Sequence, residues 1–206
     1  MMLTNKKRLT LSLAIIILSI AADQIIKFAV KLSMFKHESI RVFDWFYIYF
    51  TENRGMAFGM ELFDKLFLTS FRLVAVGFIA YYLSKIISNA KFPTGYIVCI
   101  ALVLSGAIGN LIDSIFYGEI FTDSDGRVAE LVKWGSGYGE FLHGHVVDMF
   151  YFPLFGFDWP QWMPIVGGEH FIFFSPIFNF ADACVSCGMI AILIFYGKYL
   201  NMSFKK

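Results

Sequence analysis

The sequence predicts an all-α membrane protein with four transmembrane helices, on the evidence of composition, apolar run length and charge placement. Of the 206 residues, 58% are hydrophobic and only 16% are charged, whereas charged residues make up about a quarter of a soluble globular domain. The 25 Phe and 10 Tyr residues supply more apolar surface than a disordered chain leaves in water. The net charge of +1 offers no concentrated basic surface, so nucleic acid is not an expected partner.

Four stretches reach the roughly 20 mostly apolar residues that a helix needs to cross the hydrocarbon core. They run from about Leu9 to Phe28, Leu66 to Ile87, Tyr96 to Phe116 and Pro176 to Tyr196. The basic start would also suit a cleaved signal peptide, but three more spans follow, so we expect an uncleaved anchor. The chain, 1–206, is predicted to form one membrane-embedded domain with outer segments 29–65 and 117–175.

Basic residues gather in three regions that contain no Asp or Glu. These regions are the amino-terminal tail, the link between the second and third spans, and the carboxy-terminal tail, with Lys6, Lys7, Arg8, Lys85, Lys91, Lys198, Lys205 and Lys206. By the positive-inside rule both termini are predicted to be cytoplasmic and the two longer connections to lie outside. The protein is therefore expected to be a multi-pass protein of the cytoplasmic membrane.

The two outer connections have structure of their own. The run from Ile40 to Phe50 is aromatic and β-branched, which is typical of a strand, and it leads to a turn at Asn53, Arg54 and Gly55. The second connection carries Trp134, Trp159 and Trp162, and tryptophan beside a bilayer commonly sits at headgroup depth. We expect this connection to lie on the membrane surface and partly to cover the helices.

Polar residues within the spans fall at one level of the membrane. Ionisable groups there are costly unless they face a bundle interior or water, so they are candidates for function. The set consists of Asp23, Lys27, Arg72, Asn110, Asp113, Asn179 and Asp182, all expected in the outer parts of the four spans. Asp23 and Lys27 stand four residues apart, which favours an intrahelical ion pair with a structural role.

The spacing of these residues indicates how they cooperate. Asn110 and Asp113 are three residues apart, as are Asn179 and Asp182, so each pair is predicted to share a helix face. An amide can donate to a carboxylate or to a substrate carbonyl.

Two local signals concern the helices themselves. Pro176 suits the first position of the fourth helix with Ser175 as its cap. Gly106 and Gly109 are predicted to let another backbone approach the third helix closely.

One further carboxylate lies outside the spans, in the sequence from His143 to Phe150. Asp148 is flanked by apolar residues, so partial burial should raise its pKa. His143 and His145 with Asp148 would also suit a zinc site, but a His-x-His pattern alone is weak evidence and no metal is predicted.

Five blocks of this sequence, in order, resemble the lipoprotein signal peptidases (signal peptidase II). Asp23-Gln24-Ile25-Ile26-Lys27 is similar to that family's D-Q-x-x-K. The others are Asn53-Arg54-Gly55-Met56-Ala57-Phe58-Gly59, similar to N-x-G-x-A-F-G, Gly109-Asn110-Leu111-Ile112-Asp113, similar to G-N-x-x-D, His145-Val146-Val147-Asp148, similar to V-V-D, and Phe178-Asn179-Phe180-Ala181-Asp182, similar to F-N-x-A-D.

The resemblance implies a four-helix aspartyl protease of the bacterial inner membrane, with a small extracytoplasmic β-cradle and the active site near the outer face. It implies cleavage of diacylglyceryl-modified prolipoproteins just before the lipidated cysteine, without a metal or organic cofactor. Substrate and membrane lipid are then the expected partners. The matching blocks make Asp148 and Asp182 the catalytic pair, and they assign substrate-binding or dyad-orienting roles to Asn53, Gly55, Asn110, Asp113 and Asn179.

The residues alone do not choose between Asp148 and Asp113 as the partner of Asp182; that choice comes from the resemblance. The sequence also departs from the family, because Ser114 stands where an arginine usually follows the G-N-x-x-D block. We hypothesise that Arg72 or Arg54 supplies the missing donor. The outer segments are longer than the family's compact pattern and have no role assigned from sequence.

Two rival functions fit parts of the pattern. Intramembrane Asp and Lys also mark ion pathways, which would suit a small transporter or a proton-conducting subunit. The charges cluster on one side, however, and form no path to the cytoplasm. A metal-dependent hydrolase using His143 and His145 is the other alternative, and a chelator would inactivate it.

Overall fold

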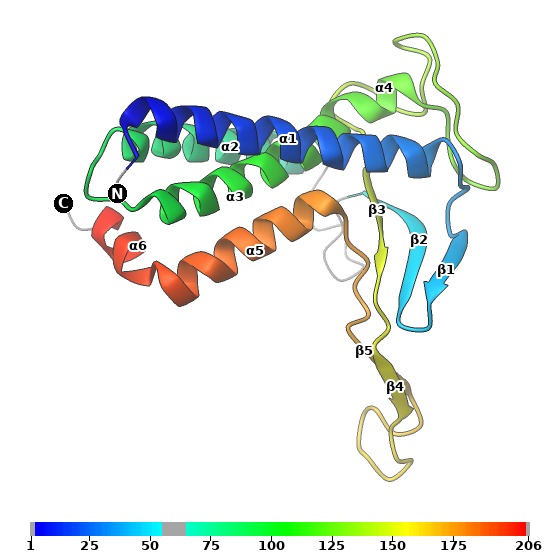
Figure 1. The fold of residues 1–206 in the computed structure, drawn as a ribbon. Coiled ribbons are helices and arrows are strands. Elements are labelled where there is room, and N and C mark those ends of the chain that lie inside the picture. The colour runs from blue at the N-terminus through cyan, green and yellow to red at the C-terminus, as the bar shows by residue number, and fades with distance from the viewer. Residues whose placement is uncertain (1–2, 55–64, 205–206) are drawn as a thin grey trace.

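The computed structural model describes residues 3–54 and 65–204, which form a helical bundle with small antiparallel sheets at one end (Figure 1). Helix α1 spans Asn5–Lys31, α2 spans Lys65–Ile87 and α3 spans Thr94–Ile112. Helix α3 continues through a π-helical turn, η1 (Asp113–Tyr117), into the short α4 (Gly118–Ile120). Helix α5 covers Phe180–Phe195 and α6 covers Gly197–Phe204.

Three helices in the described residues are long and apolar enough to cross a membrane, namely Asn5–Lys31, Lys65–Ile87 and the continuous stretch Thr94–Ile120. Helix α5 is apolar but has only 16 residues. The predicted start of this helix at Pro176 with Ser175 as cap is wrong, because Asn179 is its N-cap. The preceding residues cannot be helical, since Phe178 pairs through its backbone with Phe150.

Helix α3 lies at the centre of the bundle and packs against α1, α2 and α5. Gly106 allows the backbones of α3 and α5 to approach each other closely, because a Cβ there would lie 2.2 Å from the carbonyl oxygen of Ala181 on α5. At Gly109 a Cβ would lie 2.7 Å from Oδ2 of Asp23 on α1. The predicted close backbone approach is therefore confirmed at Gly106, whereas the atoms nearest Gly109 belong to the side chains of Asp23 and Ala181.

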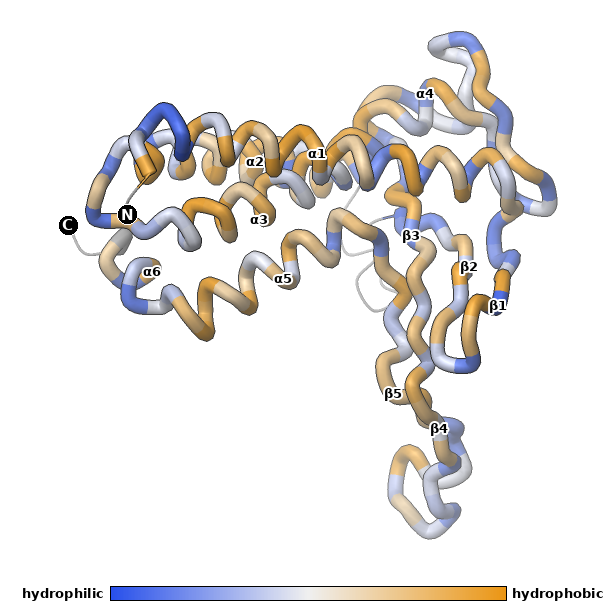
Figure 2. Tube along the Cα trace, viewed as in Figure 1, coloured by the Kyte–Doolittle hydropathy of each residue, from blue (hydrophilic) through white to orange (hydrophobic). Residues whose placement is uncertain are grey.

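Hydrophobic residues recur along α1, α2 and α5 (Figure 2). Exposed side chains there include Leu18, Val74, Phe78 and Ile194. Apolar residues exposed over whole helix faces suit contact with lipid rather than water.

Within residues 3–54 and 65–204, five strands form two small antiparallel sheets beside the helices. Strands β1 (Ser39–Phe43), β2 (Phe46–Asn53) and β3 (Val146–Tyr151) make an antiparallel sheet in that order. Strands β4 (Phe155–Asp158) and β5 (His170–Phe173) form a separate two-stranded sheet. The run from Ile40 to Phe50 is two strands rather than one, because the chain turns at Asp44 and Trp45.

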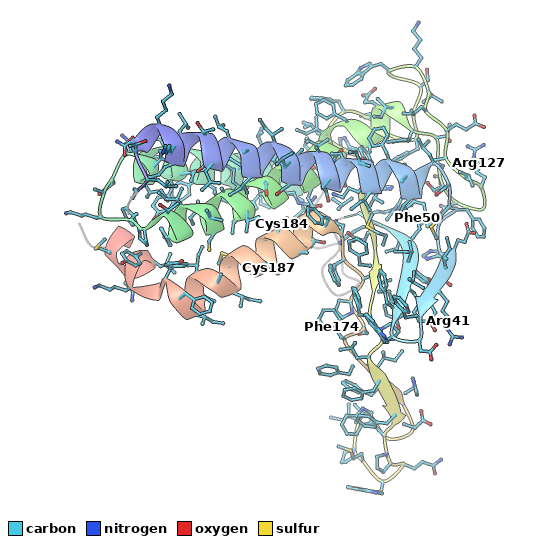
Figure 3. All side chains as sticks on the ribbon, viewed as in Figure 1. Arg41, Phe50, Arg127, Phe174, Cys184 and Cys187 are labelled. Atoms are coloured by element: carbon cyan, nitrogen blue, oxygen red, sulfur yellow. The ribbon has the colours of Figure 1, made fainter. Side chains whose placement is uncertain are left out.

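Both ends of the chain and the α2–α3 link lie at one end of the bundle, and the sheets lie at the other (Figure 1). Arg8 ties the amino-terminal end to the link, since its Nη1 donates to the carbonyl oxygen of Asn89 at 3.3 Å. Figure 3 shows Arg127 and Arg41 beyond the opposite end of the helices, with Phe50 between α1 and the three-stranded sheet.

A buried ion pair joins the end of α1 to this sheet. Lys31, fully buried, pairs with Glu52 on β2 and donates to Oγ of Ser124 at 2.9 Å. His145 Nδ1 lies 3.3 Å from the other oxygen of Glu52. Burial opposes ionisation of Glu52, but the His145 hydrogen bond and the Lys31 charge outweigh it and hold its pKa at about 2. This network fixes the strand next to β3, where Asp148 lies.

Candidate active site

Asp148 and Asp182 come together through Asn179. Asp148 lies on β3, and Asp182 is the third residue of α5. The Asn179 side-chain amide donates to Oδ1 of Asp148 at 2.7 Å. Asn179 and Asp182 also form a reciprocal capping box at the start of α5. The side-chain Oδ1 of Asn179 accepts from the backbone N–H of Asp182 at 2.9 Å, and the backbone N–H of Asn179 donates to Oδ2 of Asp182 at 3.3 Å. One residue thus contacts both carboxyl groups.

Asn110 on α3 closes the cluster from the opposite side. Its Nδ2 donates to Oδ1 of Asp182 at 2.7 Å. Its Oδ1 accepts from Asn179 at 3.0 Å and from Lys27 Nζ at 2.9 Å. The predicted Asn110 and Asn179 therefore meet each other and the two carboxyl groups, although Asn179 acts as a helix cap rather than from a helix face.

Asp113 is held elsewhere. It is fully buried at the start of η1, where Oδ2 forms an ion pair with Lys27 at 2.8 Å and accepts from the Val147 amide at 3.2 Å. Its Oδ1 accepts from Gln24 at 3.0 Å. Because the charge of Asp113 is paired and both oxygens have donors, this carboxylate supports β3 beside the dyad.

The predicted intrahelical pair between Asp23 and Lys27 is confirmed at 2.9 Å. It is part of a larger group than the spacing indicated, since Lys27 lies between Asp23 and Asp113. Asp23 Oδ1 also accepts from the Ala181 amide at 2.9 Å, at the start of α5. These contacts tie α1, α3 and α5 together directly beneath the dyad.

Burial governs the acidity of Asp148, whose residue is only 5% exposed. Burial and the nearby charge of Asp182 raise its pKa to about 7, against an opposing effect of the Asn179 hydrogen bond. The raised pKa expected from its apolar flanks is therefore confirmed. Because a carboxyl with a pKa of about 7 is protonated in a large share of the molecules near neutral pH, Asp148 can act as an acid there.

Arg72 contacts Ser114, the residue that stands where an arginine was expected. Its Nη1 donates to Oγ of Ser114 at 2.7 Å, and Ser114 in turn donates to the Asn110 carbonyl oxygen at 2.9 Å. The Arg72 charge is attracted by Asp182, Asp113 and Asp148. Arg54, the other candidate, is exposed. The guanidinium thus reaches the site from α2.

The remaining predicted residues are Asn53, Gly55 and the two histidines, His143 and His145. Asn53 lies at the end of β2 opposite Val146, with Thr51 opposite Asp148 on the same pair of strands. Gly55 lies outside the described residues. The histidines do not gather around Asp148, because His145 contacts Glu52 and His143 contacts the Phe141 carbonyl oxygen. Within residues 3–54 and 65–204, no group of three or more His, Cys, Asp or Glu side chains is arranged to hold a metal ion.

Gln24 belongs to the site's support and was not singled out from the sequence. Its side-chain nitrogen donates to Asp23, to Asp113 and to the Gly109 carbonyl oxygen, and its Oε1 accepts from Tyr117 OH at 3.1 Å. The available signal was a second polar residue next to Asp23 in an apolar span.

Comparison with known proteins identifies related chains. Residues 15–197 match the family model described as "Signal peptidase (SPase) II". The lipoprotein signal peptidase of Porphyromonas gingivalis is 49% identical over 189 residues, which cover 92% of this chain and 84% of that protein. The lipoprotein signal peptidase of Amoebophilus asiaticus is 31% identical over 186 residues, which cover 87% and 75%. A solved bacterial membrane enzyme, 24% identical, has a similar fold, with a TM-score of 0.59 over 90% of this chain and 91% of that chain.

The fold and these matches define the class of protein as an integral-membrane aspartic peptidase. The alternative of a small transporter or proton-conducting subunit is not favoured. The chain belongs to the signal peptidase II family, because the family model covers most of its length.

Proposed function

We propose that this protein removes the signal peptide from diacylglyceryl-modified prolipoproteins just before the lipidated cysteine, with Asp148 and Asp182 as its catalytic dyad. The observation that carries this proposal is the position of Asn179, whose side chain and backbone contact both carboxyl groups. Family membership supplies the reaction and the substrate class.

Two close carboxyl groups cannot both ionise freely, so they share one proton. Asp148, with its pKa raised to about 7 by burial and by Asp182, holds that proton and donates it in a hydrogen bond to the scissile carbonyl. Asp182 accepts N–H bonds from Asn110 and Asn179, which suit a carboxylate, and it removes a proton from the attacking water. Acid–base catalysis of this kind contributes about 10²- to 10⁴-fold, and positioning supplies the rest.

The neighbouring polar residues position the dyad and the substrate. Asn110 and Asn179 orient the carboxyl groups, and Asp113 holds β3 through the Val147 amide. We assign Arg72 to substrate peptide carbonyls, because its guanidinium is fixed by Ser114 and carries further donors. We also assign substrate binding to Asn53, at the end of β2, and to Gly55.

We further propose that the site faces the outer side of the bacterial cytoplasmic membrane and that α5 is the fourth span. Both ends of the chain lie at one end of the bundle, which supports an even number of crossings (Figure 1). Lys6, Lys7, Arg8, Lys85 and Lys91 carry positive charge at that end, which indicates the cytoplasm. The three-stranded sheet then serves as the extracytoplasmic cradle beside the dyad.

The membrane location follows from the substrate. Two acyl chains hold a prolipoprotein in the bilayer, so a dyad at the outer interface meets the cleavage site without extracting the lipid.

Cleavage of a lipidated prolipoprotein peptide by purified protein tests the proposal. Asp148→Asn and Asp182→Asn should each abolish turnover, whereas Glu140→Gln, which alters an exposed carboxyl group away from the dyad, should retain it. Full activity in either Asp variant would remove that residue from the dyad, and equal cleavage of a peptide lacking the diacylglyceryl group would contradict the substrate class.

A further inference from the structure

The segment between the two dyad residues forms an arm that the proposed reaction does not use. Residues 154–174, here called the aromatic arm, contain β4 and β5 and the loop between them. In Figure 1 the arm leaves the sheet end of the bundle and extends sideways, across the direction of the helices. Figure 3 places Phe174 at its base.

One face of the arm is aromatic. Phe155 pairs with Phe173 and Phe157 with Phe171, so these four side chains lie on the same face of the ribbon. Their ring centroids are 4.8 Å and 5.2 Å apart within the two pairs. Trp159 extends the face, with its ring centroid 4.8 Å from that of Phe157.

Nothing in the described chain covers this face. Within residues 3–54 and 65–204, β4 and β5 pair only with each other, and all four Phe rings are exposed. At the tip, Trp162 is 80% exposed and Ile165 is 99% exposed. An isolated two-stranded hairpin is only marginally stable in water. The arm therefore needs an apolar partner.

Its charge and position indicate what that partner is. The arm contains no Lys or Arg and only two acidic residues, Asp158 and Glu169, and Asp158 is paired with His170 at 2.5 Å. Hydrophobic residues occur along both strands of the arm, as they do along the helices of the bundle (Figure 2). The arm starts at the sheet end of the bundle and runs across the direction of the helices, which suits a segment lying along a membrane surface (Figure 1).

We infer that the aromatic arm inserts its exposed face into the headgroup–acyl interface of the outer leaflet. Trp and Phe side chains are suited to that depth, and the lack of basic residues makes the interaction independent of anionic lipid. This inference rests on the proposed orientation of the site.

Contact between the arm and the membrane would also fix the depth of Asp148 and Asp182 relative to the membrane surface. Phe150 and Phe178 exchange backbone hydrogen bonds at 2.7 Å and 3.1 Å, joining the end of β3 to the residue before Asn179. The arm extends from this same pair of segments. Anchoring it in the interface therefore holds Asp148 and Asp182 at the level where the lipidated substrate presents its cleavage site.

Depth-dependent quenching of a single tryptophan tests the inference without relying on cleavage. Trp45→Phe, Trp134→Phe and Trp159→Phe leave Trp162 as the reporter, because the chain has four Trp residues. The control replaces all four by Phe and carries Arg127→Trp, at the exposed end beyond the helices (Figure 3). Both are reconstituted into phosphatidylcholine vesicles with brominated acyl chains, and aqueous acrylamide is added separately.

We expect brominated lipid to quench Trp162 several-fold more than the reporter at position 127, and acrylamide to show the reverse order. Equal acrylamide access at both positions would refute the inference. Protection of Trp162 from both quenchers would show a protein occupant, such as a second copy, and would also refute it. Quenching that needs anionic lipid or disappears in high salt would contradict an uncharged contact.

If loss of Trp159 unfolds the hairpin, a variant with Trp45→Phe, Trp134→Phe and Trp162→Phe keeps Trp159, on the aromatic face, as the single reporter. Prolipoprotein cleavage by the parent protein is measured separately, so that failure of the membrane contact and failure of the proposed function are distinguishable.

Discussion

Replacing Asp148 by Asn should remove activity and raise stability, with the gain in stability confined to higher pH. The folded protein holds the Asp148 pKa at about 7, mainly through burial and the Asp182 charge, whereas the ordinary value is 3.8. Between these values the folded state binds more protons than the unfolded state, so stability falls as pH rises through this window. Above about pH 7 Asp148 is ionised in both states, and the cost of burying its charge lowers the free energy of unfolding by at most about 4 kcal/mol.

Asparagine cannot ionise, yet its side-chain oxygen can still accept the hydrogen bond from Asn179. Asp148→Asn should therefore unfold at a higher denaturant concentration than the parent at about pH 8, and the difference should shrink towards about pH 4. Unfolding in detergent at both pH values measures this, with Glu140→Gln as the exposed carboxyl control.

In the same preparations kcat/KM of Asp148→Asn should fall by about 10² or more, and parental activity should decline as pH rises past about 7. A variant that is no more stable than the parent at the higher pH, or equally stabilised at both, would refute the reasoning about burial of Asp148.

Three further predictions concern the support of the site. Glu52→Gln should lose up to roughly 3 kcal/mol of stability, because the folded pKa of about 2 lies below the ordinary 4.5. In the parent, unfolding titrations should show this contribution above about pH 4.5 and its loss as pH falls towards about 2. Gly106→Ala should lower the free energy of unfolding by about 1–3 kcal/mol and reduce cleavage, because its Cβ would lie 2.2 Å from the Ala181 carbonyl oxygen. Gly77→Ala is the control, since open space surrounds that position. Equal stability and cleavage in the two variants would contradict the close packing. Arg72→Gln should lower kcat/KM by about tenfold, with partial retention in Arg72→Lys; parental rates in Arg72→Gln would exclude its assigned contact with substrate.

The helical part of the fold was readable from local pattern. Apolar runs near the length of a membrane crossing located α1, α2 and α3, because span length is set by the bilayer rather than by neighbouring elements. The Asp23–Lys27 pair and the close approach at Gly106 also followed from spacing, since both depend on residues that share one helix face.

The β structure was less predictable. The aromatic run ending at Phe50 indicated a strand, but its division into β1 and β2 depends on a turn at Asp44 and Trp45 that carries no strong turn signal. The β4–β5 hairpin was missed, because its strands have only four residues each and Trp, Pro and Gly fill the loop between them.

The sequence by itself determined that this is a membrane protein with its polar residues at one level, and the five blocks indicated its family. Only the tertiary structure shows which neighbours each carboxyl group has. Lys27 and Gln24 bind Asp113, while Asn179 donates to Asp148 and caps the helix that carries Asp182. The physical reason is that hydrogen bonds and ion pairs between segments more than 30 residues apart depend on how helices and strands pack, and spacing along one element does not encode them.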